Sequence, residues 1–417
     1  MRGKRSSIGL RAALGIFSVT LLVTSTWAAT QETVLHNFGK GKDGSGSVAS
    51  LIFDSAGNLY GTTEYGGPYN YGMVFELTPK AGGGWTEKVL HNFNNNGKDG
   101  GNPAGGLIFD ATGNLYGTTA GGGIHGSGTV FELTPKAGGG WTEKVLHNFN
   151  NNGKDGTAPP AGVIFDAVGN LYGTCSTGGA YNSGTVFELA PKAGGGWTEK
   201  VLHTFKNNSK DGLSPYGGLV LDAAGNLYGT TEGGGVHGVY GTVFELAPKA
   251  GGGWTEKVLH SFNQDGKDGY SPEAGLIFDA VGSLYGTTVY GGIYLVGQGT
   301  VFKLTPKTGG GWTEKVLSSF GSGSGDAINP YTGLILDAAG NLYGTTYYGG
   351  AYSDGTVFKL TPQAGGGWKK ALLYSFNSSG DGINPRSSLI FDAAGSLYGT
   401  TYFGGADYHG TVFEITP

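Results

Sequence analysis

Cysteine, charge and long apolar segments are all scarce in this 417-residue sequence. The single cysteine, Cys175, excludes an internal disulfide, so stability has to come from packing and closure of the fold. Charged residues make up 14 % of the chain against 38 % hydrophobic and 12 % aromatic residues, the reverse of a disordered composition. Beyond the first 30 residues, no stretch resembles a transmembrane helix and no helical periodicity appears. The chain should therefore fold without helices.

The N-terminal segment has the features of a secretory signal peptide. Four basic residues within the first eleven positions precede a short apolar run at 12–23, and Thr26-Trp27-Ala28 offers small residues at the two positions that a signal peptidase recognises. We predict a signal peptide at residues 1–28 and a mature chain at 29–417 that is secreted or periplasmic and has no membrane span. An uncleaved membrane anchor is the alternative, but the apolar run is short for a span.

Positive charge is also scarce in the predicted mature chain. Without the first 28 residues, 22 Lys and Arg stand against 31 Asp and Glu, a net charge of −9. Such a balance disfavours nucleic acid and anionic membranes as partners. We expect a monomer that binds no nucleic acid.

Glycine, in contrast, is abundant, with 85 residues, and it follows a tandem repeat. The string Leu-Tyr-Gly-Thr recurs at intervals of 55 to 58 residues, beginning at Leu59, Leu115, Leu171, Leu227, Leu284, Leu342 and Leu397. Seven copies of about 56 residues fill residues 31 to 417 and leave no room for a second domain.

Each copy predicts four short strands, named a to d in chain order. In the second copy these are 106–110, 115–119, 128–134 and 141–149, all rich in β-branched and aromatic residues and bounded by Gly, Pro or Asn. Four strands repeated seven times predict an all-β fold, a seven-bladed β-propeller with four antiparallel strands per blade.

The order of strands along the chain predicts how the ring closes. The mature chain begins with an isolated strand d at 33–38 and ends with a strand c at 412–416 that no strand d follows. We expect strand 33–38 to complete the blade of residues 384–417, because an open ring would expose two strand edges.

The repeat also resembles a known family. Gly-Leu-Ile-Phe-Asp-x-x-Gly-Asn-Leu-Tyr-Gly-Thr-Thr followed by Gly-Thr-Val-Phe-Glu-Leu is similar to the GloVer (Gloeo/Verruco) tandem repeat of exported bacterial proteins. The resemblance covers all seven copies and implies export and a propeller-like array, without an established activity. The blades are more loosely similar to kelch and NHL blades, which supports the fold but no function.

The b–c and d–a loops lie on one face of the predicted ring, and every change in repeat length falls in them. Loops on a rigid scaffold commonly carry binding groups. Tyrosine offers an apolar ring and a hydroxyl, which suits sugar rings and peptides. An alternative is that these rings pack on neighbouring loops. The candidate ligand-binding tyrosines of the b–c loops are Tyr240, Tyr290, Tyr294, Tyr348, Tyr352, Tyr402 and Tyr408.

One position just before strand a varies from copy to copy at the predicted mouth of the channel. In chain order, this mouth position holds Val48, Ala104, Pro160, Tyr216, Glu273, Tyr331 and Arg386. We predict a ligand site at the mouth of blades four to seven, where Tyr216 and Tyr331 stack or hydrogen-bond and where Glu273 and Arg386 hold polar groups. Variation without a function is the alternative.

Repeated aspartates and histidines give no metal site at this stage. The Asp of each d–a loop, such as Asp99, suits a turn, and the alternating ligands of an EF-hand calcium loop are missing, although calcium stays an alternative. Equivalent histidines such as His91 and His147 lie on outer strands of different blades, too far apart to share one ion. We therefore expect no metal and no cofactor.

These observations favour an exported binding or interaction module for a glycan or a peptide. A carbohydrate-active enzyme, a hydrolase or a lyase, is the first alternative, with Glu273 as the best single acid, but glycosidases normally need two carboxylates. A purely structural envelope protein is the second alternative.

Overall fold

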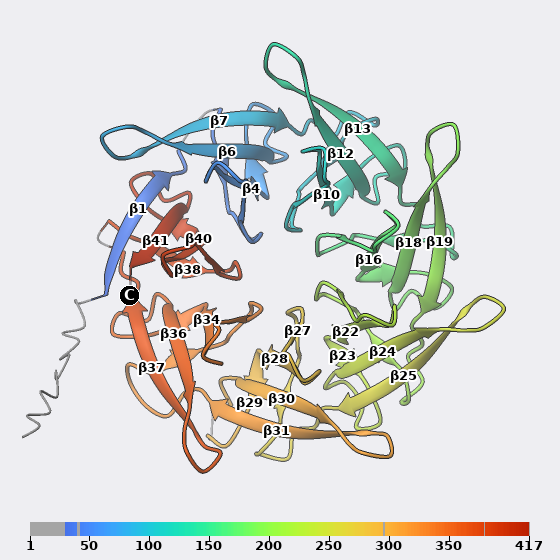
Figure 1. Ribbon diagram of the computed structural model, residues 1–417, viewed down its shortest axis with the longest axis vertical. Helices are drawn as coiled ribbons and strands as arrows, with labels where there is room; N and C mark the ends of the chain where they lie inside the picture. Colours follow the sequence, from blue (N-terminus) through green and yellow to red (C-terminus); the bar gives the residue numbers. More distant parts are fainter. Residues whose placement is uncertain (1–29, 40–41, 295–296, 379, 417) are drawn as a thin grey trace, which may run out of the picture.

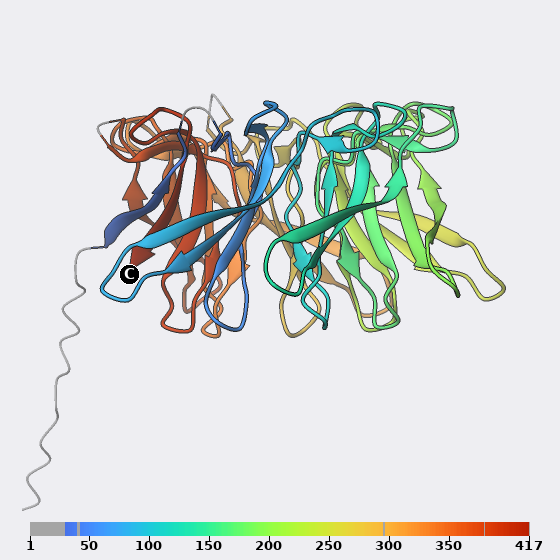
Figure 2. The same cartoon turned by 90° about the horizontal axis from the view of Figure 1, so that it is seen from above.

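The computed structural model describes residues 30–39, 42–294, 297–378 and 380–416, which form a seven-bladed β-propeller (Figure 1). The predicted signal peptide, residues 1–28, lies outside the described residues. Seen from the side, the strands run between two loop-bearing faces of a ring (Figure 2). Within the described part of the chain, no helix has the length and hydropathy needed to cross a bilayer.

Each blade is an antiparallel sheet whose strand order is a, b, c, d, with a nearest the axis and d outermost (Figure 1). The a strands are β3 (Ile52–Phe53), β9 (Ile108–Phe109), β15 (Ile164–Phe165), β21 (Val220–Leu221), β27 (Ile277–Phe278), β33 (Ile335–Leu336) and β39 (Ile390–Phe391). The b strands are β4 (Leu59–Thr63), β10 (Leu115–Thr119), β16 (Leu171–Cys175), β22 (Leu227–Thr231), β28 (Leu284–Thr288), β34 (Leu342–Thr346) and β40 (Leu397–Gly404).

The outer half of each blade is longer. The c strands are β6 (Met73–Pro79), β12 (Thr129–Pro135), β18 (Thr185–Pro191), β24 (Thr242–Pro248), β30 (Thr300–Pro306), β36 (Thr356–Pro362) and β41 (Thr411–Thr416). The d strands are β7 (Trp85–Asn92), β13 (Trp141–Asn148), β19 (Trp197–Thr204), β25 (Trp254–Ser261), β31 (Trp312–Ser319), β37 (Trp368–Ser375) and β1 (Gln31–Asn37).

Short strand pairs also join each d–a loop to the b–c loop of its blade, a feature that the sequence did not predict. They are β2 (Gly44–Ser45) with β5 (Tyr65–Gly66), β8 (Gly100–Gly101) with β11 (Gly121–Gly122), β14 (Gly156–Thr157) with β17 (Thr177–Gly178), β20 (Gly212–Leu213) with β23 (Gly233–Gly234), β26 (Gly269–Tyr270) with β29 (Tyr290–Gly291), β32 (Ala327–Ile328) with β35 (Tyr348–Gly349), and β38 (Gly382–Pro385) with the end of β40. Both loops of a blade are thus held in one layer.

The ring closes as predicted, because β1 forms the outer strand of the last blade. It pairs antiparallel with β41, with Thr33 opposite Glu414 and Val34 opposite Phe413. The first and last strands of the chain therefore lie side by side (Figure 1), and neither edge is left unpaired.

The hydrophobic core lies between neighbouring blades, where each of seven clusters joins two blades. In the second cluster, Tyr60 and Val74 of the first blade pack with Leu115 and Phe131 of the next. The glycine of strand b follows from this packing, since a Cβ on Gly117 would lie 2.6 Å from the ring of Phe131. Any larger residue would displace this fully buried ring.

The repeated Tyr and Trp also connect adjacent blades. The ring of Tyr116 in β10 meets those of Phe165 and Trp197 in the following blade, at centroid distances of 5.1 and 6.4 Å. Its hydroxyl donates to Asp110 Oδ2 at 3.1 Å, and Asp110 also accepts from the backbone N–H of Asn114 at 2.9 Å. The a–b turn aspartate is structural, as its position in the sequence suggested.

Strand a is shorter than predicted, with Ile108–Phe109 in place of 106–110. Gly105 and Gly106 leave the sheet and lie against the entrance loop of the next blade, where Gly162 approaches them closely. The backbone of this segment therefore contributes to the axial lining rather than to the blade.

Candidate functional site

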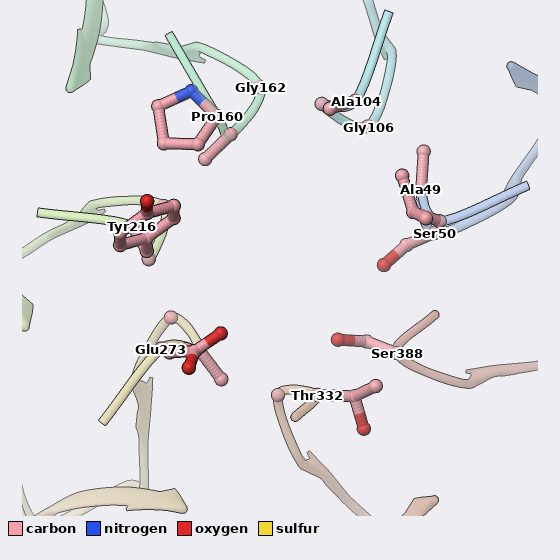
Figure 3. Close-up of a pocket in the computed structure, with 18 of the residues that line it drawn as sticks. Ala49, Ser50, Ala104, Gly106, Pro160, Gly162, Tyr216, Glu273, Thr332 and Ser388 are labelled. Atoms are coloured by element: carbon pink, nitrogen blue, oxygen red, sulfur yellow. The ribbon is translucent and has the colours of Figure 1, made fainter. Parts of the chain in front are cut away.

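The entrances to the seven a strands meet around the axis and line one cavity of about 560 Å³. All seven residues of the mouth position line this cavity, which brings Tyr216, Glu273, Tyr331 and Arg386 together as expected. Figure 3 shows Tyr216 and Glu273 side by side, facing Ser50, Ser388 and Thr332 across the cavity. Its volume lies within the range of sites for small molecules, about 300–1,000 Å³.

The entrance loops are held by hydrogen bonds between blades. The hydroxyl of Thr118 in β10 donates to the carbonyl of Ala161 in the following blade at 2.8 Å. Thr230 bonds Ala274 in the same way at 2.8 Å. Because these carbonyls neighbour the mouth position, the ring of blades fixes the backbone of the cavity before any ligand arrives.

At the mouth position the cavity has an apolar side and a polar side. Blades one to three contribute the small residues Val48, Ala104 and Pro160 there, although Ser50, Glu64 and Ser176 of these blades also line the cavity. Blades four to seven contribute polar and aromatic residues at the mouth position, and Ser388 and Thr332 add hydroxyls (Figure 3). A ligand in this cavity would therefore meet small mouth residues on one side and aromatic and charged mouth residues on the other.

Glu273 is the acidic group of this polar side. Burial raises the pKa of Glu273 to about 7, nearby Glu232 adds to the increase, and Arg386 opposes it. Within the described residues its carboxylate forms no hydrogen bond. Near neutral pH, the group can therefore accept or donate a proton.

Arg386 is the basic group of the same side, and it is held by aromatic rings. Its guanidinium carbon lies 5.6 Å from the ring centre of Tyr331 and 5.9 Å from that of Tyr402. Among the described residues it forms no ion pair within 4.0 Å. These cation–π contacts favour a guanidinium position beside the two rings, at the edge of the cavity.

Tyrosine rings continue from this point around the loop face. Tyr240 lies 5.6 Å from Tyr270, and Tyr270 stacks on Tyr290 at 5.5 Å with an interplanar angle of 27°. Burial and the neighbouring Tyr290 raise the pKa of Tyr331, whose ring meets that of Tyr347 at 5.5 Å. We call these five residues the tyrosine arc. Its rings are partly exposed and partly packed on one another, and ligand binding by these tyrosines stays a prediction.

None of the seven predicted b–c loop tyrosines lines the cavity, which of the predicted site residues only the four mouth residues do. Tyr348 packs edge-on against Tyr347 at 4.6 Å, whereas Tyr352 and Tyr408 are more than half exposed on outer loops. Tyr294 lies in the b–c loop of the fifth blade, next to residues that the structure does not describe. These residues belong to the same face but not to the cavity.

Two contributors were absent from the predicted site. Tyr270 completes the stack beside Tyr290, and Glu64 lines the cavity from the first blade. Tyr270 occupies a variable position three residues before the mouth position, so a comparison of the copies at this second position would have found it. The position of Glu64 holds a glutamate in only one other copy, Glu232 of the fourth, and the distance of Glu64 from Glu273 in the sequence hides their shared cavity.

Each of the five repeated histidines contacts the aspartate of the d–a loop that follows its strand. His91 Nε2 lies 3.2 Å from Asp99 Oδ2, and His147 Nε2 lies 3.1 Å from Asp155 Oδ2. Asp99 also accepts the backbone N–H of Gly100 at 2.7 Å. The aspartate of the d–a loop thus shapes its turn and orients the histidine.

Comparison with protein families finds one match, described as the Gloeobacter/Verrucomicrobia repeat. It covers residues 13–206, 88–298 and 282–417, which together span nearly the whole chain. No curated protein matches the sequence.

Solved structures share the propeller fold at low identity. The extracellular domain of BT4673 from B. thetaiotaomicron, named as a one component system, matches with a TM-score of 0.56, 14 % identity and 94 % of this chain. An ancestral GH74 enzyme matches with a TM-score of 0.55, 12 % identity and 89 % of this chain. PorZ, a surface component of the type-IX secretion system of Porphyromonas gingivalis, matches with a TM-score of 0.51, 16 % identity and 91 % of this chain. The matches cover 42 %, 47 % and 47 % of those three longer chains, and at these identities they show the fold alone.

Proposed function

Because the chain belongs to the Gloeobacter/Verrucomicrobia repeat family, whose copies here surround one axial cavity, we propose that it is an exported binding module that holds a glycan in this cavity. The observation that carries the proposal is the convergence of one variable repeat position on the axis. Positions that build the blades are alike in all copies, whereas this one places Tyr216, Glu273, Tyr331 and Arg386 on a single cavity wall.

The chemistry of the wall suits a sugar. Tyr216 is 39 % exposed, so its ring face is open to a pyranose ring. Glu273 and Arg386 present an acceptor and donors to hydroxyl groups, and the serine and threonine hydroxyls add further partners. The tyrosine arc extends this surface outward, which suits a ligand longer than one sugar unit. The open cavity also favours a ligand over a purely structural role.

A screen of residues 29–417 against glycan and peptide arrays tests this proposal. We expect glycan binding that a Tyr216→Ala/Tyr331→Ala double variant reduces by at least about tenfold, roughly 1.4 kcal/mol. A Tyr69→Ala/Tyr181→Ala double variant is the matched control, because both tyrosines are exposed on other blades. Binding only to peptides would replace glycan by peptide as the ligand, and binding that both double variants retain would refute the site.

The carbohydrate-active enzyme is the second candidate, and the state of Glu273 favours it. A carboxyl group with a pKa of about 7 in a cavity is a candidate general acid. Glu64 lines the same cavity and is the second carboxylate that such chemistry needs. Release of reducing sugar from a bound oligosaccharide, abolished by Glu273→Gln without loss of binding, would support the enzyme. Unchanged ligand after long incubation would support the binding module.

A further inference from the structure

Three metal-ligating side chains meet at the seam where the ring closes. His36 lies in β1, Asp43 in the loop that follows, and Glu87 in β7 of the first blade. One ligand atom from each lies within 4.8 Å of the other two, and among the described residues no other group of three meets this condition. The three residues therefore connect the strand that completes the last blade to the outer strand of the first.

Two of the three ligand atoms lack a hydrogen-bond partner. His36 Nε2 and Glu87 Oε1 are both shielded from solvent and form no hydrogen bond among the described residues. His36 Nε2 lies 3.4 Å from Asp43 Oδ2, longer than the contacts in other blades. Backbone N–H groups of Gly39 and Gly44 hold the Asp43 carboxylate in place at 2.8 and 2.7 Å. The imidazole nitrogen of His36 and the carboxylate oxygen of Glu87 thus lie near the fixed carboxylate of Asp43, but neither has a hydrogen-bond partner.

Equivalent seams share the unpartnered glutamate oxygen, as at Glu143 Oε1, but among the described residues only the closing seam brings three ligand atoms within 4.8 Å of one another. At the second seam, between the first and second blades, His91 Nε2 lies 3.2 Å from Asp99 Oδ2 and forms a hydrogen bond with it. The equivalent glutamate there, Glu143, does not join the other two within 4.8 Å. The closing seam holds the same residue types, drawn together around a common point.

The interface between the fifth and sixth blades is the sixth seam when the closing seam is counted as the first. It shows that a cation fits at this position of the blade interface. Ser318 stands there in place of the histidine and Lys370 in place of the glutamate. The Lys370 ammonium lies 2.6 Å from Asp326 Oδ1, so the chain itself supplies a positive charge between the blades. The closing seam has the carboxylates of Asp43 and Glu87 but no lysine at the glutamate position.

We propose that His36, Asp43 and Glu87 bind a first-row divalent metal ion, with Zn²⁺ the best match, across the closing seam. One imidazole nitrogen and two carboxylate oxygens suit zinc, whereas calcium prefers oxygen ligands alone. Ligand atoms around a tetrahedral zinc lie about 3.4 Å apart, from bonds of about 2.1 Å, so rotamer changes of about an ångström bring the three atoms into place. The bound ion would link β1 to β7 and stabilise the closed ring.

Zinc titration of the chelator-treated propeller, residues 29–417, tests the proposal. We expect one equivalent of Zn²⁺ in calorimetry and a higher melting temperature with zinc than with EDTA. His36→Gln and Glu87→Gln should weaken this binding by at least about 10- to 100-fold. Glu143→Gln is the matched control, because it makes the same change at the second seam, and it should bind zinc as the wild type does.

Three results would overturn the assignment. The first is the absence of binding and of any melting shift at micromolar zinc. The second is binding that survives both His36→Gln and Glu87→Gln, which would place the ion on exposed histidines elsewhere. The third is an equal loss in Glu143→Gln, which would make the effect one of seam stability. Circular dichroism of each variant shows whether it is folded, and manganese titration of the wild type tests the metal class.

Discussion

The rings of Phe38 and Phe75 meet edge to face, with their centres 5.3 Å apart. Phe38 follows the strand that completes the last blade, and Phe75 lies in β6 of the first blade. Both are fully buried in the same cluster. This contact is the hydrophobic part of the ring closure. An equivalent contact joins the second and third blades, where the ring centres of Phe149 and Phe187 lie 5.0 Å apart.

Loss of the closing contact should destabilise the ring. Phe38→Ala removes a fully buried ring, and we expect a loss of about 3–5 kcal/mol in the free energy of unfolding, measured by denaturant titration. Phe149→Ala is the matched interior variant and should lose a similar amount while remaining monomeric.

Deletion of residues 31–38 goes further, because it leaves the β41 edge unpaired. We expect a lower melting temperature and oligomers in light scattering. An unchanged melting temperature together with a monomeric mass would contradict the closure.

Cys175 stands where the other six copies have threonine, and the exchange leaves a buried hydroxyl without a conventional partner. Thr119 bonds Thr129 at 2.8 Å in the second blade, whereas Thr185 Oγ1, at the equivalent place in the third, has no hydrogen bond. Cys175→Thr should restore this bond and add about 1 kcal/mol of stability. Cys175→Val is the control, since it keeps the shape without the hydroxyl. Equal melting temperatures for the two variants would count against this interpretation.

Glutamates at the blade seams should make the protein more stable at mildly acidic pH. Burial raises the pKa of Glu143 to about 7 from its ordinary value of 4.5, Asp99 of the preceding blade adds to the increase, and His91 opposes it. The same pattern holds for Glu199, Glu256 and Glu314. A pKa that is higher in the folded state gives stability that is fully present below pH 4.5 and is lost as the pH rises through about 7.

We therefore expect the melting temperature to fall between pH 5 and pH 8 in buffer with a chelator. Glu143→Gln removes the charge at one seam, so this variant should lose less stability over the same range. Melting curves that run parallel for the wild type and the variant would show that the seam glutamates do not carry the effect.

The sequence predicted the blades and their closure because each depends on local and repeated features. The sequence placed β1 beside β41 correctly. It did so because the predicted mature chain begins with an isolated strand d and a strand c ends at Thr416. The short pairs such as β8 with β11 were missed, because two glycines carry no side-chain pattern that distinguishes a strand from a loop. Strand a was overestimated, since Gly105 and Gly106 lie outside it and closely approach the entrance loop of the next blade at Gly162.

Comparison of the copies predicted which residues lie around the axis, but not how they contact one another. All seven mouth residues line the cavity because the repeat puts them at the same place in each blade. The cation–π contacts of Arg386 with Tyr331 and Tyr402 join two blades, and no spacing within one copy encodes the contact with Tyr331. The b–c loop tyrosines, such as Tyr290 and Tyr294, do not line the cavity, and repeat spacing alone does not tell which loop rings reach the axis.

The most direct test fills the cavity from its apolar side without removing any polar group. Ala104→Trp places a large ring among the residues that line the cavity, and Ala137→Trp makes the same change on an exposed c–d loop. The affinity for a glycan identified in the screen is then measured by calorimetry for both variants. We predict that Ala104→Trp loses at least about tenfold in affinity, roughly 1.4 kcal/mol, with an unchanged melting temperature, and that Ala137→Trp binds as the wild type does. Undiminished affinity in a folded Ala104→Trp variant would contradict the axial cavity as the binding site.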